Sequence, residues 1–142
     1  MNNQEHVQQL SRRIETIMLD SDLNLEILDI SKKTLADHWQ VILMARLEIP
    51  VDTLYGNNTE GLPPASAIRE ALGDPLVYEH INIRQFVSEE NKPAVLELLM
   101  KNFKKEILPY ISHPDFSKNY AIKKYREHAK LQLSYPDEKT TR

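Results

Sequence analysis

The chain has 142 residues, of which 41% are hydrophobic and 27% are charged, and its formal net charge is −3 at pH 7. A chain of this length buries roughly two thirds of its unfolded surface, so a single core can form without metal or disulfide crosslinks. The composition excludes a wholly disordered chain, and the lack of cysteine excludes disulfides, cysteine nucleophiles and cysteine-ligated metal sites. We therefore expect one globular domain over residues 1–133 and a mobile C-terminal tail over residues 134–142.

The N-terminal segment carries apolar residues at helical spacing, namely Val7, Leu10, Ile14 and Ile17. This spacing predicts an amphipathic helix with one narrow apolar stripe. A polar break at residues 20–22 follows, and the alternation from Leu23 to Ile27 then predicts a strand. Leu28 and Ile30 continue in the opposite phase, which indicates a β-bulge in this strand.

Residues 39–51 form the clearest pattern in the chain, because apolar and more polar side chains alternate along the whole segment. The residues predicted to face the core are Trp39, Val41, Leu43, Ala45, Leu47, Ile49 and Val51. With a turn at residues 32–37, this long strand and the preceding one are expected to pair as an antiparallel hairpin.

The second half of the chain predicts one more strand and three helices. Prolines and a glycine bracket a short helix within residues 63–73. Residues 76–87 predict a third strand, in which Ile81 and Ile83 take over the inward side after a change of phase. Two further amphipathic helices are predicted at residues 92–107 and 116–129.

The expected element order is therefore α-β-β-α-β-α-α, which indicates an α+β domain. Its sheet should be small, largely antiparallel and three-stranded, with helices packed on one face. The outer side of the long strand carries Ile42 and Met44 between polar residues, and such a half-apolar face is often covered by a helix or by a second subunit. We expect a homodimer whose interface includes Ile42 and Met44.

No motif in the sequence points to catalysis. Nucleophile elbows, glycine-rich phosphate loops and EF-hand spacing are all missing. His38 and His80 each follow an acid and would form a metal or acid–base site if their strands brought them together. Neighbouring residues on a strand point to opposite faces, however, which favours the simpler interpretation that both are polar strand residues. We expect no catalytic residue, no metal site and no cofactor.

Charge is unevenly distributed along the chain. Residues 1–100 hold 8 basic and 16 acidic side chains, whereas residues 101–142 hold 10 basic and 5 acidic ones. The basic region combines cations with tyrosines that would contact a phosphate backbone and stack on bases. Its candidate binding residues are Lys118, Tyr120, Lys123, Lys124, Tyr125 and Arg126. Lysines late in a helix also complement its dipole without any partner, and a sequence pI near 6.0 argues against a nucleic-acid-binding protein.

The first thirty residues do not resemble a signal peptide, and no apolar run approaches about 18 residues, so we expect a cytoplasmic protein that does not act at a membrane. The most consistent function is that of a non-enzymatic module that binds another protein or assembles with itself. The alternative is nucleic-acid binding through the basic, tyrosine-containing C-terminal helices. A third option is an enzyme or small-ligand protein with a histidine-containing pocket between the sheet and residues 56–61.

Overall fold

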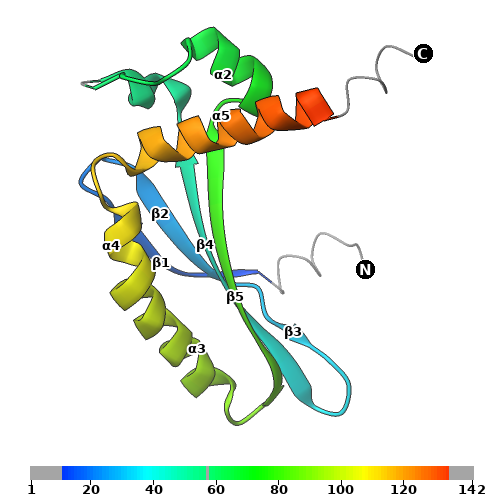
Figure 1. Cartoon of the computed structure of the whole chain (residues 1–142). Helices are drawn as coiled ribbons and strands as arrows, with labels where there is room; N and C mark the ends of the chain where they lie inside the picture. Colours follow the sequence, from blue (N-terminus) through cyan, green and yellow to red (C-terminus); the bar gives the residue numbers. More distant parts are fainter. Residues whose placement is uncertain (1–10, 57, 135–142) are drawn as a thin grey trace, which may run out of the picture. The chain divides into compact units, whose positions relative to one another are not determined.

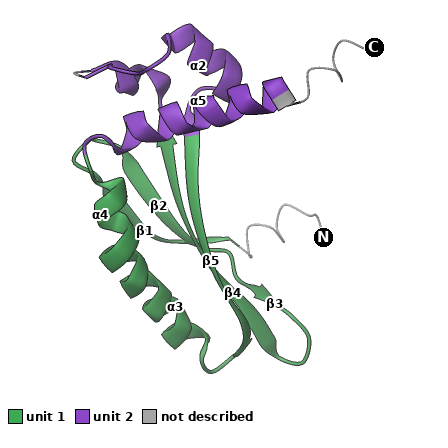
Figure 2. Ribbon diagram, in the orientation of Figure 1, with its two compact units in different colours: residues 1–48, 77–113 green, residues 49–76, 114–142 purple. Residues whose placement is uncertain are grey.

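A computed structural model describes residues 11–56 and 58–134 of the chain (Figure 1). It combines a five-stranded sheet with helices, so the α+β class expected from the sequence is confirmed. The chain divides into two compact units, each built from two separate stretches (Figure 2). Unit 1 comprises residues 1–48 and 77–113, and unit 2 comprises residues 49–76 and 114–142.

The sheet has five strands rather than the three that the sequence predicts. They are β1 (Arg12–Met18), β2 (Asn24–Asp29), β3 (Lys32–Lys33), β4 (His38–Ile49) and β5 (Leu76–Ser88). β2 and β3 both pair antiparallel with β4 in one unbroken register that runs from Leu25 opposite Leu47 to Lys33 opposite Trp39. The predicted hairpin is therefore confirmed. β1 pairs with β2 and β5 pairs with β4, which adds strands beside it.

The predicted N-terminal helix is wrong where the structure describes it, because residues 12–18 form strand β1. The register between β1 and β2 shifts between Arg13 and Glu15, which leaves Ile14 as an extra residue in a β-bulge. Ile14 and Ile17 are three residues apart in the sequence, which is the spacing of a helical stripe, because the bulge interrupts the two-residue period of the strand. β-Branched residues also favour a strand over a helix when a partner strand is present. The remainder of the predicted helix, residues 1–10, lies outside the described part of the chain.

The phase change predicted within β2 is also wrong, since the inward side continues from Ile27 to Asp29 and then Ser31, both of which are buried. The Asp29 carboxylate accepts a hydrogen bond of 2.9 Å from the Ser31 backbone N–H. Its other oxygen lies 3.3 Å from the Arg12 guanidinium and 3.9 Å from the Lys92 ammonium. Polar residues can occupy the buried side here because each finds a partner.

A continuous helical segment covers one face of the sheet in unit 1 (Figure 1). It comprises α3 (Lys92–Asn102), a π-helical turn η2 (Phe103–Ile107) and α4 (Leu108–Ile111). Leu96, Leu99 and Phe103 are buried, as the predicted apolar stripe requires. Pro109 has no N–H to donate to the fourth preceding carbonyl, and its ring would clash with that carbonyl, which explains why the regular α-helix is interrupted just before it.

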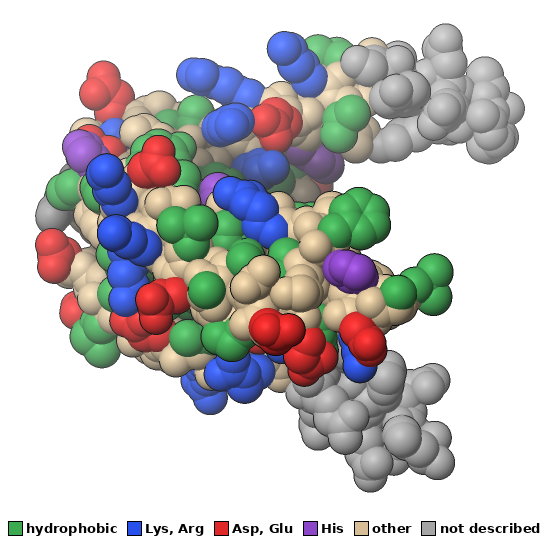
Figure 3. Space-filling view, turned by 90° about the horizontal axis from the view of Figure 1, so that it is seen from below, with side chains coloured by type: hydrophobic (Ala, Val, Ile, Leu, Met, Phe, Trp, Pro, Cys, Tyr) green, Lys and Arg blue, Asp and Glu red, His purple; other side chains and the backbone are tan. Residues whose placement is uncertain are grey.

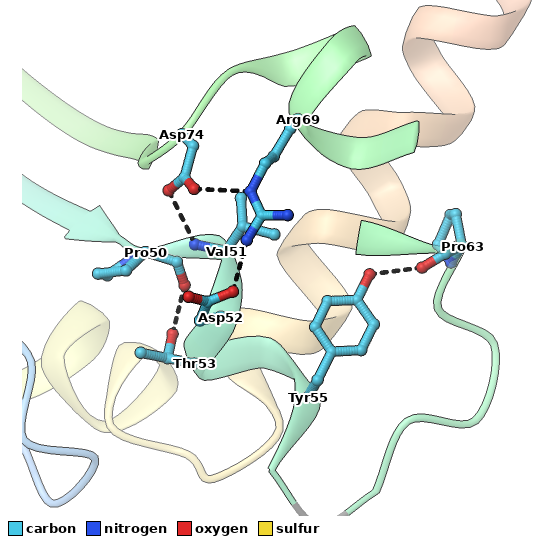
Figure 4. A network of polar contacts seen from close by, with 8 residues as sticks. All are labelled: Pro50, Val51, Asp52, Thr53, Tyr55, Pro63, Arg69 and Asp74. Carbon is cyan, nitrogen blue, oxygen red and sulfur yellow. Dashed lines mark hydrogen bonds and ion pairs between the residues drawn. The ribbon is translucent and has the colours of Figure 1, made fainter. Parts of the chain in front are cut away.

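Unit 2 contains a 3₁₀ helix η1 (Val51–Tyr55), the short helix α2 (Ala65–Leu72) and the long helix α5 (Phe116–Ser134). Asp74 joins the first two, because it accepts hydrogen bonds of 3.0 Å from the Val51 backbone N–H and from Arg69 Nε (Figure 4). The bond from Val51 and the neighbouring Arg69 guanidinium hold the pKa of Asp74 below its ordinary value. Most of the tail predicted from residue 134 onward lies outside the described residues.

Candidate interaction surfaces

The strand register assigns each side chain of the sheet to one of two faces, because directly paired residues point the same way. The face that α3 and η2 cover includes Leu25 with Leu47 and Ile27 with Ala45. On β5 this covered face includes His80, whose ring centroid lies 5.8 Å from that of Phe103. The opposite face, called here the outer face, carries the even-numbered residues of β4 and includes Glu26, Leu28, Met44, Arg46, Val77, Glu79, Ile81 and Ile83.

Three aliphatic residues on β5 are exposed on the outer face. The exposed fractions of Val77, Ile81 and Ile83 are 36%, 48% and 43%. The prediction that Ile81 and Ile83 face the core is therefore wrong. The side chains of β5 alternate between the two faces without interruption as far as Phe86. Phe86 has a positive φ of 56°, and Val87, which follows it, is buried. Alternating β-branched residues gave the correct signal for a strand, but hydrophobicity alone did not reveal which face is covered.

Ion pairs lie among these aliphatic residues, so the outer face carries both positive and negative side chains. Arg46 Nη1 lies 2.9 Å from Glu79 and Nη2 lies 3.1 Å from Glu48. The hydrogen bond to Glu48 is the main cause of a raised pKa of Arg46. Arg13 pairs with Glu26 at 3.2 Å on the adjacent strands. Figure 3 shows one side of the molecule in space-filling form, where hydrophobic side chains lie between acidic and basic ones.

The two residues predicted at a dimer interface differ in accessibility. Ile42 is only 6% exposed in the free chain, whereas Met44 is half-buried. Met44 lies on the outer face opposite Leu28, which is also half-buried. The more accessible apolar residues of this face are therefore those of β5.

The histidines do not converge. His38 begins β4 on the side of the even-numbered residues, which is the outer face, whereas His80 lies on the covered face against Phe103. Glu79 points away from His80 and toward Arg46, as the pleat of a strand requires. Among the described residues, no group of three or more His, Cys, Asp and Glu side chains is placed to hold a metal ion.

The basic residues near the C-terminus fall into both units. Lys101, Lys104 and Lys105 belong to unit 1, where Lys104 lies 2.9 Å from Glu15. The remaining candidates lie on α5 in unit 2, and they are Lys118, Tyr120, Lys123, Lys124, Tyr125 and Arg126.

Within α5 the predicted binding residues play different parts. Tyr120 is half-buried and stacks on Phe116 with ring centroids 5.8 Å apart. Lys124 pairs with Glu127 at 3.4 Å. Lys123 and Arg126 of the predicted set border one open groove on α5, together with Asn119, Ile122, Glu127 and Lys130, whereas Lys118 lies at a different pocket beside residues 53–58.

Comparisons with protein-family models, with curated proteins and with solved structures find no match to this chain. In the described residues, no helix is both long enough and apolar enough to cross a bilayer. The candidate interaction surfaces are therefore the outer face of the sheet and the groove on α5.

Proposed function

We propose that this protein is a non-enzymatic self-assembly module and that the outer face of its sheet is the interface between two copies. The observation that supports this proposal is the row of half-exposed aliphatic residues Val77, Ile81 and Ile83 on one face. Exposed apolar side chains rimmed by polar ones are typical of protein interaction sites.

A second copy fits this face because its charges are self-complementary. Two-fold pairing places the same patch on both sides of an interface, so a suitable patch must be complementary to a second copy of itself. The outer face offers apolar residues that can pack against each other. It also offers Arg46 close to Glu48 and Glu79, so each cation of one copy can face an anion of the other. A patch of a single charge sign would repel its two-fold copy.

The expected affinity is weak. The three residues are 36–48% exposed, and burying the rest of one such side chain contributes about 1 kcal/mol. Three from each copy therefore contribute about 6 kcal/mol, which is similar to the lower estimates for the cost of association. We expect a dimer whose population depends on protein concentration.

Sedimentation velocity of the full chain across a dilution series tests the proposal. The native protein should shift from dimer to monomer on dilution, and Ile81→Asp should be monomeric at every concentration with an unchanged thermal midpoint. Leu133→Asp is the matched control, because Leu133 is a 78% exposed leucine on α5 outside this face. A native protein that is monomeric throughout, or equal loss of dimer in both variants, would contradict the proposal.

A further inference from the structure

The long helix of unit 2 concentrates positive charge. α5 carries five basic side chains, Lys118, Lys123, Lys124, Arg126 and Lys130, and one acidic side chain, Glu127. Glu127 pairs with Lys124 at 3.4 Å, so the acid is already partly neutralised within the helix. The residues that follow α5 add two acids and two bases and leave the net charge of this region unchanged.

Three of these cations form a row. Lys123, Arg126 and Lys130 follow each other at intervals of three and four residues, which places them on one side of a helix. They border the same open groove, with the Asn119 amide beside them. Within the described residues, none of the three lies in an ion pair. Their charge is therefore available to a ligand.

The length of the row matches a series of phosphates. Lys123 and Lys130 are seven residues apart, which corresponds to roughly 10 Å along a helix axis. One strand of a nucleic acid presents a phosphate about every 3.4 Å along the duplex axis, so the row spans about three of them. The planar guanidinium of Arg126 can bind a phosphate through two hydrogen bonds.

From this arrangement we infer a second activity beyond self-assembly: α5 binds the phosphate backbone of a nucleic-acid strand through Lys123, Arg126 and Lys130. The contact is independent of base sequence. Tyr120, which the sequence suggested as a stacking platform, is half-buried against Phe116 and does not offer a free ring face for a base. A membrane surface fits less well, because the groove contributes only Ile122 as an apolar side chain, and the exposed Leu131 and Leu133 follow the last cation of the row and do not line the groove.

Fluorescence anisotropy with a labelled single-stranded oligonucleotide, and with a duplex of the same sequence, tests the inference. Three phosphate contacts predict that affinity falls about 20-fold for the single strand, and about 40-fold for the duplex, between roughly 50 and 200 mM salt. If the single-stranded oligonucleotide binds more tightly, the ligand is a single strand, and if the duplex binds more tightly, the ligand is a double strand. The triple variant Lys123→Gln, Arg126→Gln, Lys130→Gln should lose at least tenfold in affinity and nearly all of the salt dependence.

The matched control is the triple variant Lys101→Gln, Lys104→Gln, Lys105→Gln, which removes the same charge from another groove in unit 1. It should retain the native affinity within a factor of about two, because counterion release depends on the contacted phosphates alone. Equal losses in the two triple variants would overturn the assignment to α5. So would the absence of oligonucleotide binding, or equal binding to polyglutamate or to phosphatidylserine vesicles. Circular dichroism of both variants confirms that the fold is retained.

Discussion

Replacement of Asp29 tests whether the polar contacts beneath the helical segment hold unit 1 together. The Asp29 side chain is 5% exposed and faces three donors, the Ser31 backbone N–H at 2.9 Å, Arg12 at 3.3 Å and Lys92 at 3.9 Å. Lys92 also lies 3.9 Å from the centroid of the Trp39 ring. The carboxylate therefore connects β1, β2 and the first residue of α3.

Asp29→Ala should lower the free energy of unfolding by about 2–4 kcal/mol. A buried hydrogen bond to a charged group is worth about 1.5–3 kcal/mol, and the unpaired Ser31 N–H and the partly buried Lys92 add to the loss. Asp29→Asn keeps an acceptor for the Ser31 N–H but removes the charge, so its cost should be smaller, about 1–2 kcal/mol.

Urea denaturation followed by tryptophan fluorescence measures these differences, because Trp39 lies within the same cluster. Glu26→Ala is the control on the same strand. Its partner Arg13 is largely exposed, and exposed ion pairs contribute less than about 1 kcal/mol. If Asp29→Ala and Glu26→Ala shift the urea midpoint equally, the buried contacts of Asp29 do not stabilise the fold as argued.

Two further predictions concern the sheet and unit 2. Leu43→Asp should lower the free energy of unfolding, measured by urea denaturation, by about 3–5 kcal/mol, because it buries a charge directly opposite Asp29. Gln40→Asp on the other face should lower it by less than about 1 kcal/mol. Similar losses in the two variants would contradict the assignment of faces. The lowered pKa of Asp74 means that its stabilisation of unit 2 is complete above the unfolded-state value of 3.8 and is lost as the pH falls through the lower folded-state pKa. The thermal midpoint of Asp74→Asn should therefore lie below that of the native protein at neutral pH and converge with it in acid, and a constant difference at all pH values would show that the charge of Asp74 does not matter.

The sequence predicts β4 well because its pattern is long and repeats at every second residue, so its buried positions other than Ile42 fall on one face. β1 was missed for a local reason, since the bulge at Ile14 breaks the two-residue period that identifies a strand. Asp29 and Ser31 were missed for a non-local reason. Asp29 contacts Arg12 from another strand and Lys92 from a helix far along the chain, and the Ser31 hydroxyl accepts a hydrogen bond from the Ile42 backbone N–H. No local pattern shows that a polar residue has such partners.

For the candidate surfaces, too, local sequence patterns were not sufficient. Local charge identified α5 as basic, but the structure was needed to show that Lys124 is paired while Lys123 and Arg126 border a groove. Likewise, the alternation of Ile81 and Ile83 is equally compatible with a core strand and with an exposed one. The ring contact of His80 with Phe103 and the hydrogen bond of Glu79 with Arg46 establish which side of β5 the helices cover.

The two proposed activities differ in physical origin, so salt can separate them. Association through the outer face depends mainly on burial of aliphatic groups, which salt does not screen, and on charge pairs whose signs balance locally. Phosphate binding by α5 depends on counterion release and weakens steeply as salt rises. A dimer that persists at a salt concentration where oligonucleotide binding is lost would place the two activities on independent surfaces. If both disappear together, the cations of α5 contribute to the dimer interface, and the outer face is not sufficient to hold two copies together.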